Sequence, residues 1–506
     1  MALAGLDIGG TGVKAVIFGK NGEIYSSAYQ EYNMIQEHSG WYEFWPEDIY
    51  EAAMRVLSQC VRDCEEEIQG IGVSSFGESW VLTDEYGAVI SNSIIYLDNR
   101  GQEYVDELLS MVDLEEYRQK TGTAPRLVHS IYKLKVMERH HPGILKRVRN
   151  FHFVADFVIS RLGGGNFTDY GLAATSGAFD INDNQWISWI WEWAGLNPEI
   201  LPVLVPAGSC MGNLSVQAAR ILGLKAGIPL VSGGHDHTPA SLSAGVYRSG
   251  TAMNAIGTTD SWTMVTNNKV SLKMLRPPTY YKNHLMTGHY IVMPKANMSG
   301  GVLLKWFRDN MGRYEKKLCE DNRENFYEEY EKRMPQKPTD LLVFPRFGGF
   351  GKNMGSSAGI LNMTLSTTSE EIYRAFMEGE TFEMYSSLKA YMESVEPVSE
   401  VIAVNGGANC DTYMQIRADI YALPVYTVAC NQPGALGNAM LAGVAAGIYA
   451  DITEAVTRCR RIRKVFEPVS INHEYYMEQY EKYLKIYDFL NGVERTVQIK
   501  EQEKKK

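Results

Sequence analysis

This chain has fewer basic than acidic residues. Its 506 residues include 49 lysines and arginines against 60 aspartates and glutamates, which gives a formal net charge of −11. Nucleic acids and anionic membrane surfaces attract basic proteins and repel acidic ones. We therefore expect neither as a partner.

Long apolar runs and a cysteine framework are missing as well. No stretch approaches the roughly 20 apolar residues that a membrane-spanning helix needs. The chain opens directly into an apolar run without a charged leader, so we expect no signal peptide. Its seven cysteines are odd in number and scattered, which is typical of reduced thiols. Cys60 and Cys64 share a helix face without a second pair of ligands, so core packing is expected there rather than zinc. We predict a cytoplasmic protein.

What is present is an ordinary globular composition, with 45% hydrophobic and 22% charged residues. Strand–turn–strand sets alternate with helical periods in both halves, which predicts an α/β protein with mixed sheets. We place a domain boundary near 246–250. It separates an N-terminal domain at 1–247 from a C-terminal domain at 248–506, with a helix and tail from about 470.

A strand–loop–strand pattern occurs twice, once at the start of each half. Residues 3–18 read LAGLDIGGTGVKAVIF and residues 250–265 read GTAMNAIGTTDSWTMV. Glycines let backbone N–H groups approach a phosphate closely, and threonine hydroxyls add donors. Two such turns predict two similar domains that grip a nucleotide's phosphates from opposite sides, although either turn alone could be a plain hairpin. The second copy has Ala255 at the position of Asp7, so Asp7 is the residue predicted to lie near the metal ion.

Asp236 is the candidate general base. It lies in GGHDH, after an apolar strand and at the start of a helix, where an acid faces the ligand-binding edge of an open α/β sheet. A carboxylate there can accept the proton of an attacking alcohol. The alternative is that Asp236 caps the helix. We expect His237 to contact the substrate and His235 to be structural, because an alternating triplet gives no chelating face.

Two further strand ends carry polar residues. Glu78 follows Phe76-Gly77, with Trp80 close behind. A carboxylate and an aromatic ring suit sugar recognition, although a solvated loop acid is the alternative for Glu78. Gly407 lies in a glycine turn after another strand and Asp411 opens a helix, which suits close approach of adenine or ribose. The alternative there is an Asp N-cap.

In this order the segments resemble the FGGY family of carbohydrate kinases over roughly residues 3–460. The resemblance is carried by these motifs: DIGGTGVKAVIF, GWYEFWPEDIY, IGVSSFGESWVLTDEYGAVISNSIIYLDNR, GIPLVSGGHDH, GTTDS and VNGGANCDTYMQIRADIYALPV. It implies two ribonuclease H-like domains of the actin and hexokinase type, flanking a central cleft. The chain departs from the family at Gly77-Glu78, where Met-His or Arg-Glu is frequent, and at Tyr96, where tryptophan is common.

The resemblance also implies roles for individual residues. Asp236 falls on the catalytic base and Asp7 on the acid near the magnesium ion. Glu78 and His237 fall on substrate-contacting positions, and Trp80 and Asp98 are predicted to join them. The nucleotide is predicted to contact two phosphate loops and the adenosine end of the second domain, through Gly9, Gly10, Thr11, Lys14, Gly257, Thr258, Gly407 and Asp411.

We therefore predict an ATP- and Mg²⁺-dependent kinase that transfers the γ-phosphoryl group to a primary hydroxyl of a small ketose or polyol. The family likeness suggests a homodimer. One rival is a ROK-type sugar kinase, but such chains are shorter and usually carry a cysteine-rich zinc motif. The other is an actin-like sensor that binds nucleotide and sugar without transfer. The presence of both Asp7 and Asp236 argues against the sensor.

Overall fold

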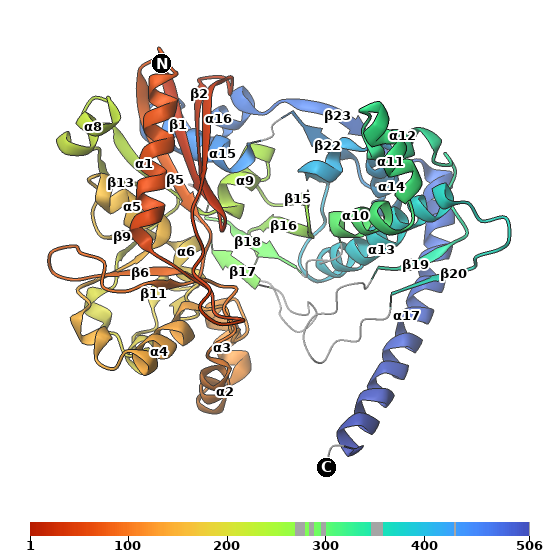
Figure 1. The fold of residues 1–506 in the computed structure, drawn as a ribbon, viewed down its shortest axis with the longest axis horizontal. Coiled ribbons are helices and arrows are strands. Elements are labelled where there is room, and N and C mark those ends of the chain that lie inside the picture. Colours follow the sequence, from red (N-terminus) through yellow and green to blue (C-terminus); the bar gives the residue numbers. More distant parts are fainter. Residues whose placement is uncertain (269–278, 283–287, 295–299, 346–357, 430–431, 505–506) are drawn as a thin grey trace.

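Two α/β lobes, each built on one mixed sheet, make up the protein (Figure 1). The computed structural model describes residues 1–268, 279–282, 288–294, 300–345, 358–429 and 432–504. Across those residues, every helix is either too short or too polar to cross a membrane. The predicted α/β class is confirmed.

The first sheet has the order β13-β14-β5-β1-β2-β3. Its three central strands, β14, β5 and β1, are parallel, and their apolar sequences are buried on both faces. The other three pair antiparallel. The strands are β1 (Ala2–Ile8), β2 (Gly12–Gly19), β3 (Ile24–Glu31), β5 (Ile68–Ser75), β13 (Cys210–Asn213) and β14 (Pro229–His235).

Side chains of β1 alternate between the two faces of this sheet, as a strand requires. Ala4, Leu6 and Ile8 belong to the large core cluster that also includes residues of α1 (Pro46–Arg62), α5 (Val154–Leu162) and α8 (Val216–Leu222). Leu3 faces the other way, into the core beside α15 (Pro433–Ala445). Asp7 therefore shares the face that α15 covers.

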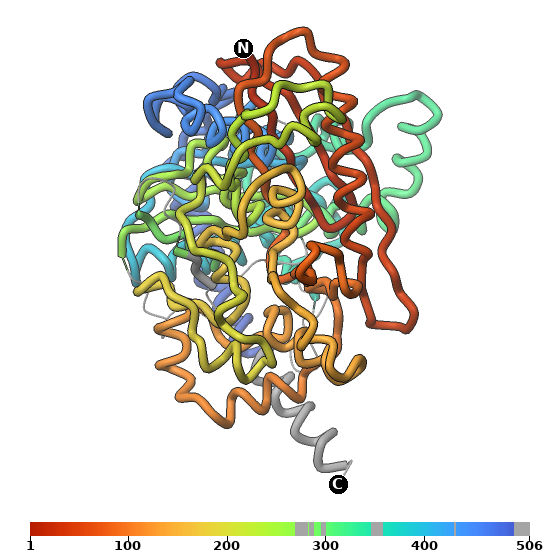
Figure 2. Tube along the Cα trace, turned by 90° about the vertical axis from the view of Figure 1, so that its left-hand side faces the viewer, coloured from red at the N-terminus to blue at the C-terminus, as the bar shows by residue number. Residues whose placement is uncertain are grey.

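A capping region covers one end of the first lobe. It fills the lower part of the lobe in Figure 2, away from the N-terminus. Its helices are α2 (Gln102–Met111), α3 (Leu114–Thr121), α4 (Ser130–His140), α6 (Tyr170–Ala174) and α7 (Ser188–Ala194), with 3₁₀ turns at Ile144–Arg147 and Pro198–Ile200. Its short strand pairs are β4 (Glu43–Phe44) with β7 (Ser93–Ile94), β6 (Trp80–Thr83) with β8 (Asn150–Phe153), β9 (Phe167–Asp169) with β12 (Val203–Val205), and β10 (Phe179–Asp180) with β11 (Gln185–Trp186).

The second sheet repeats the plan of the first, in the order β17-β18-β16-β15-β21-β22-β23. Here β15, β21 and β22 are the parallel strands, and β15 and β16 form the second hairpin. The strands are β15 (Thr251–Ile256), β16 (Asp260–Thr266), β17 (Thr279–Lys282), β18 (Tyr290–Met293), β21 (Glu400–Val404), β22 (Val425–Val428) and β23 (Ile462–Phe466). A separate pair joins β19 (Leu342–Phe344) to β20 (Gly359–Leu361).

Helices surround this sheet, and one of them runs away from the lobe. The long α13 begins with a capping box in which Thr368 and Glu371 satisfy each other's backbone N–H groups. The helices are α10 (Gly300–Asn310), α11 (Arg313–Asn322), α12 (Phe326–Arg333), α13 (Ser369–Ser394), α14 (Asp411–Tyr421) and α17 (Ser470–Lys504), and a 3₁₀ turn spans Gly406–Asn409. In Figure 1, α17 leads away from the second lobe toward the C-terminus.

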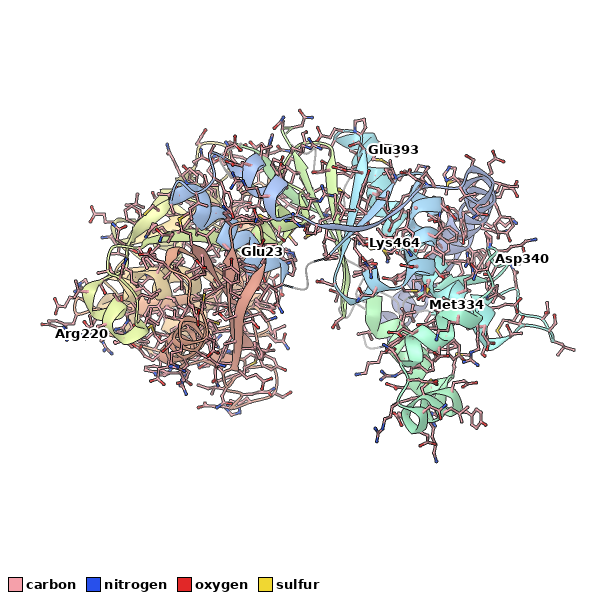
Figure 3. The ribbon with its side chains drawn as sticks, turned by 90° about the horizontal axis from the view of Figure 1, so that it is seen from above. Glu23, Arg220, Met334, Asp340, Glu393 and Lys464 are labelled. Atoms are coloured by element: carbon pink, nitrogen blue, oxygen red, sulfur yellow. The ribbon has the colours of Figure 1, made fainter. Side chains whose placement is uncertain are left out.

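The chain crosses back to the first lobe late in the sequence. Helix α15 packs on β1, β5 and β14 and along α9 (His237–Ala244), and α16 (Ile452–Cys459) packs beside it. Small residues make this contact close: a Cβ on Gly5 would collide with the carbonyl of Ala435, and one on Gly437 with that of Pro239. Seen from above, the segment after α16 passes from the lobe that carries Glu23 to the lobe that carries Lys464 (Figure 3). The boundary near 246–250 remains a prediction, and the packing of α15 extends across it.

Candidate active site

Three parallel strands of the first sheet end in one row, and the predicted site residues follow directly. Ile8, Ser75 and His235 are register partners at the ends of β1, β5 and β14. Backbone hydrogen bonds continue the row for one residue, from Phe76 N to Ile8 O and from Asp236 N to Ser75 O, each at 3.0 Å. The first glycine loop, the Glu78 segment and Asp236 therefore lie at the same edge of the sheet.

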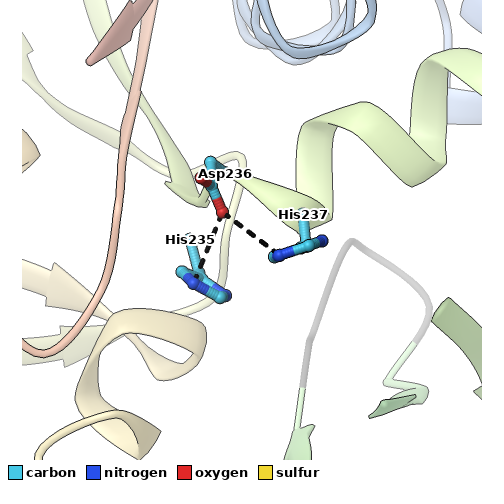
Figure 4. Close-up of side chains that lie close together, drawn as sticks. All are labelled: His235, Asp236 and His237. Atoms are coloured by element: carbon cyan, nitrogen blue, oxygen red, sulfur yellow. Dashed lines mark ion pairs between the residues drawn. The ribbon is translucent and has the colours of Figure 1, made fainter. Parts of the chain in front are cut away.

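Asp236 occupies the N-cap position of α9, but its side chain makes no capping hydrogen bond. The capping alternative is therefore wrong, and the carboxylate is left for another use. It is partly exposed, and its Oδ1 lies 3.4 Å from Nε2 of His235 and 3.9 Å from Nε2 of His237 (Figure 4). The expectation that the alternating triplet gives no chelating face is also wrong, because the strand ends at His235 and the backbone turns helical at Asp236 (φ −50°, ψ −32°).

Glu78 is held in a strained conformation beside Asp236. Its φ is +63°, which side-chain-bearing residues rarely adopt outside functional sites. Its backbone is fixed on both sides: N–H donates to Thr175 Oγ1 at 2.8 Å, and the carbonyl accepts from Ser130 Oγ at 2.5 Å. Burial raises the pKa of Glu78 to about 7, against the opposing charge of Arg126, and Asp236 adds to the rise. This environment contradicts the solvated-acid alternative.

Asp7 lies on β1 opposite Lys14 of β2. Its Oδ1 accepts a 2.9 Å hydrogen bond from Ser74, whose hydroxyl accepts in turn from the Asn438 amide of α15. Its other oxygen faces Gly434, where an added Cβ would lie 2.6 Å away. Burial and the charge of Asp236 raise the pKa of Asp7 to about 6, while Ser74 and Lys14 oppose the rise. A carboxyl group that is costly to ionise alone gains most from a nearby cation.

The first phosphate loop, residues 9–12, is anchored at its start. Gly9 N–H donates to the Gly12 carbonyl at 2.9 Å, and Tyr32 donates its hydroxyl proton to the Gly9 carbonyl at 2.5 Å. Thr11 is exposed at the tip, 3.4 Å from the Tyr29 hydroxyl. Gly10 approaches Tyr96, since a Cβ there would lie 3.1 Å from the Tyr96 hydroxyl. The backbone N–H groups at the tip of the loop, at Gly10 and Thr11, and the Thr11 hydroxyl are thus placed to bind a phosphate.

Two predicted substrate contacts are contradicted. Trp80 is fully buried in β6 within the first core, so its ring has no face open to a sugar. Asp98 is also buried, and its carboxylate is occupied by Arg100, by Lys133 and by the Tyr42 N–H. Asp98 therefore links segments of the capping region and does not face a ligand. Both errors arise because short sequence spacing from Glu78 or Arg100 does not tell which face a side chain takes.

The second glycine loop opens onto a cavity of about 860 Å³ in the second lobe. Gly257, Thr258 and Gly407 line it, as the predicted nucleotide site requires. Apolar walls from Val302, Leu304 and Met377 alternate with polar groups. The remaining lining residues are Ile256, Gly301, Lys305, Asn325, Tyr327, Glu328, Glu331, Tyr373, Gly406, Asn409, Cys410, Tyr413 and Arg463.

Asp411 is not among the residues that line this cavity. It occupies the first turn of α14, and its carboxylate pairs with Lys464 on β23, both about half exposed. Cys410, not Asp411, stands at the N-cap position, so the capping alternative is also wrong. The predicted contact of Asp411 with the adenosine end has no support from its position.

A buried charge pair lies beneath the second loop. Asp260 closes the hairpin opposite Ile256, and Arg417 of α14 pairs with it, both fully buried. Arg417 also donates to Tyr413 at 2.6 Å and to Tyr421 at 2.8 Å, and Asn254 donates to Asp260 at 2.6 Å. Tyr413 lines the cavity, so the network joins the cavity wall to the base of the loop.

Sequence reasoning missed several residues around the site. Arg126 lies close enough to Glu78 to lower its pKa. Burial raises the pKa of Tyr96, and the charges of Asp236 and Glu78 add to the rise. Tyr96 had a signal, as a tyrosine in a position where tryptophan is common. Gly434 and Asn438 come from α15, far along the chain from Asp7, and only their place in a helix of small residues hinted at close packing.

A two-lobed α/β fold with paired glycine–threonine loops and an uncapped, partly exposed acid at a sheet edge defines a phosphotransferase of the actin and hexokinase type. The chain belongs to the FGGY family of carbohydrate kinases: residues 2–243 match the family's N-terminal domain and residues 252–446 its C-terminal domain. The predicted family is confirmed, and the protein is a carbohydrate kinase. Nothing in the comparisons supports the ROK-type kinase or the sensor.

Individual relatives agree over nearly the whole chain. The chain is 26% identical to a xylulose kinase of Bacillus subtilis over 498 residues, which is 96% of each chain. It is 25% identical to the L-fuculokinase of Escherichia coli, covering 92% of this chain and 96% of the relative. The crystal structure of a xylulose kinase from Rhodospirillum rubrum matches with a TM-score of 0.88 at 23% identity, covering 98% of this chain and all of that chain.

Proposed function

We propose that this kinase transfers the γ-phosphoryl group of ATP to a primary hydroxyl of a small ketose or polyol, with Asp236 as the general base. One observation carries the assignment. Asp236 lies at the N-terminus of a helix without capping it, at the sheet edge that also carries the glycine loop and Glu78. A carboxylate that is partly exposed, uncapped and beside the phosphate loop is suited to take a proton from an alcohol.

The chemistry asks mainly for positioning and charge stabilisation. Asp236 would accept the hydroxyl proton as the alcohol oxygen attacks the γ-phosphorus and the bond to the β-phosphate oxygen breaks. Backbone N–H groups of Gly10 and Thr11, with the hydroxyls of Thr11 and Thr258, would bind the charge that spreads over the transferred group. The cavity beside Gly257 and Gly407 would hold the nucleoside, placing its phosphates between the two loops.

The residues around Asp7 fit a magnesium ion. Mg²⁺ prefers carboxylate oxygens, and the Asp7 oxygen that faces Gly434 is not the one bound by Ser74. The nearby charge of Asp236 makes the position more negative. We propose that Asp7, directly or through water, holds the ion that neutralises phosphate charge in the complex. Lys14, opposite Asp7, would add a cation on the phosphate side.

Glu78 is the proposed sugar-recognition residue. Its fixed backbone aims a carboxyl group toward Asp236 and Arg126, and a carboxyl group there can bind substrate hydroxyls. Gly77 is explained by packing, since a Cβ would lie 2.6 Å from the Thr175 side chain. Relatives named as xylulose kinase, L-fuculokinase and glycerol kinase support either a ketose or a polyol as the substrate. The homodimer and the cytoplasmic location remain predictions.

A coupled assay of ADP release over a panel of ketoses and polyols tests this function. We expect sugar-dependent ADP release with at least one ketose or polyol, with the phosphate ester at a primary carbon by ³¹P and ¹H NMR. Glu78→Gln should raise KM for that sugar while the KM for ATP changes little. ATP binding without ADP release on any sugar would contradict the proposal, and equal effects of Glu78→Gln on both KM values would remove Glu78 from sugar recognition.

A further inference from the structure

Three metal-ligating side chains converge at the end of β14. One ligand atom each from His235, Asp236 and His237 lies within 4.8 Å of the other two, and no other such group of three occurs among the described residues. Figure 4 shows both imidazole rings turned toward the same carboxylate. The phosphoryl-transfer step uses only the carboxylate. His237 is predicted to contact the substrate and His235 to be structural, and neither imidazole takes part in the chemical step.

We propose that His235, Asp236 and His237 form a binding site for a borderline-soft divalent cation, with Zn²⁺ as the type ion, and that occupancy of this site blocks the kinase. Two imidazoles and one carboxylate are a donor set that Zn²⁺ binds with a fourth position open to water. Mg²⁺ strongly prefers oxygen ligands, so this donor set discriminates against the ion expected near Asp7.

The geometry needs little change to accept the ion. With metal–ligand bonds of about 2.0–2.1 Å, tetrahedral ligand atoms lie about 3.3–3.4 Å apart. His235 Nε2 already lies 3.4 Å from Asp236 Oδ1, and His237 Nε2 lies 3.9 Å from the same oxygen. His235 is buried and fixed, whereas the side chain of His237 is about one-third exposed and has room to rotate. Closing the site requires His237 to move about half an ångström toward Asp236 Oδ1, and the three ligand atoms, which now lie within 4.8 Å of one another, to come within about 3.4 Å.

The consequence for activity rests on the proposed function of Asp236. Both imidazoles approach Oδ1 of Asp236, so an ion bound there withdraws electron density from the carboxylate and makes it a weaker base for the alcohol proton. The ion would also occupy the place of the sugar hydroxyl, so inhibition should be relieved by more sugar and not by more MgATP. The site is thus predicted to make the enzyme sensitive to free Zn²⁺ at concentrations that leave Mg²⁺ binding unchanged.

Metal binding can be measured without any turnover. We expect calorimetric titration of the full chain with ZnCl₂ to show one site, and Co²⁺ to give the visible absorption of a tetrahedral complex. His237→Gln and Asp236→Asn should each weaken Zn²⁺ binding by at least about tenfold. His141→Gln is the matched control, since it removes an exposed histidine outside the triplet, and it should leave the affinity unchanged.

Thermal unfolding of each apo variant checks that the fold is kept. Unchanged Zn²⁺ affinity in His237→Gln, or a Co²⁺ spectrum with thiolate charge transfer, would overturn the site. Zn²⁺ binding that is lost in His237→Gln, together with inhibition that sugar relieves, would support the whole proposal. Binding at the triplet that leaves sugar phosphorylation unaffected would keep the metal site and overturn both the inhibition and the role of Asp236 as base.

Discussion

The two glycine loops of this kinase share a backbone plan and differ in what lies behind them. In the first lobe, Asp7 on β1 stands before a loop at residues 9–12, and α15 covers it. In the second lobe, Ala255 stands at the equivalent place on β15, before a tighter loop at 257–259. Behind the second loop lie the cavity and the buried Asp260–Arg417 pair.

The same strand–loop–strand motif is therefore suited to a different ligand group in each lobe. An acid behind the first loop suits a cation and the reacting phosphates, together with Asp236 in the same lobe. Beneath the second loop, the charges of Asp260 and Arg417 neutralise each other in the core. The open side of this loop adjoins a partly apolar cavity that suits a nucleoside. Its carbonyls are held by helix α10, through Gly301 N–H to Gly257 O at 2.8 Å and Val302 N–H to Thr258 O at 3.2 Å. Each lobe thus uses a different support for a similar turn.

Removing the charge pair of the second lobe should have the largest effect. Arg417→Met leaves Asp260 buried without its partner, which typically costs about 3–5 kcal/mol in unfolding free energy. The double variant Asp260→Leu/Arg417→Met should recover part of that loss, since the unpartnered carboxylate of Asp260 is gone while the buried Glu380 still lacks the charge of Arg417. Denaturant unfolding measures both.

Arg55→Met is the matched control, because Arg55 forms an exposed pair with Glu51. It should change the free energy of unfolding by less than about 1 kcal/mol. A loss as small for Arg417→Met as for Arg55→Met would show that the second loop does not depend on its buried pair.

Removing the acid of the first lobe should affect activity more than stability. Asp7→Asn keeps the shape but removes the charge, and we expect kcat/KM to fall by at least about 10²-fold, with a higher Mg²⁺ concentration needed for half-maximal rate. Asp411→Asn is the comparison in the second lobe, and it should change kcat/KM less than about threefold, because its exposed pair with Lys464 is weak. Equal effects would contradict the assignment of the cation to the first loop.

The pH dependence of cation binding sharpens the same contrast. The pKa of Asp7 is raised to about 6 by burial and by the charge of Asp236. A protonated carboxyl group binds no cation, so the Mn²⁺ or Mg²⁺ affinity of the nucleotide-free enzyme should fall about tenfold per unit below pH 6 and level off above it. In Asp236→Asn the neighbouring charge is gone, so the midpoint should move to lower pH. If the pH midpoint of cation binding stays the same in Asp236→Asn, the charge of Asp236 does not affect the Asp7 carboxyl group.

The loop hydroxyls should show the smallest effects. Thr11→Val and Thr258→Val each remove one donor to phosphate, and each should lower kcat/KM by about threefold to tenfold. Thr258→Val should act mainly through the KM for ATP, since Thr258 lines the nucleoside cavity. Steady-state kinetics with ATP varied at saturating sugar measure the two variants. If neither variant alters kcat/KM, the hydroxyls do not contact phosphate.

Much of the fold was predictable because its signals are local. The hairpins at 3–18 and 250–265 and the strand before Asp236 follow from apolar runs and glycine placement, and the structure has each of them. The return of α15 to the first lobe was not predictable in this way. It depends on contacts such as Gly5 with Ala435, between residues at opposite ends of the chain.

In the site, too, the features that depend on local sequence were predictable and those that depend on distant packing were not. The placement of Asp236, Glu78 and Asp7 at one sheet edge follows from strand ends, which a sequence shows. Trp80 and Asp98 were misassigned because burial and ion pairing depend on the capping region, whose packing no local pattern encodes. The convergence of His235 and His237 on Asp236 was missed because it needs the backbone to leave the strand at one particular residue.

Single-turnover phosphoryl transfer by Asp236→Asn tests the central claim most directly. With saturating MgATP and the sugar identified by the panel, the rate of the chemical step should fall by about 10²- to 10⁴-fold, while the ATP dissociation constant stays within about twofold of the unaltered enzyme. A chemical step that proceeds at the normal rate in Asp236→Asn would contradict the account.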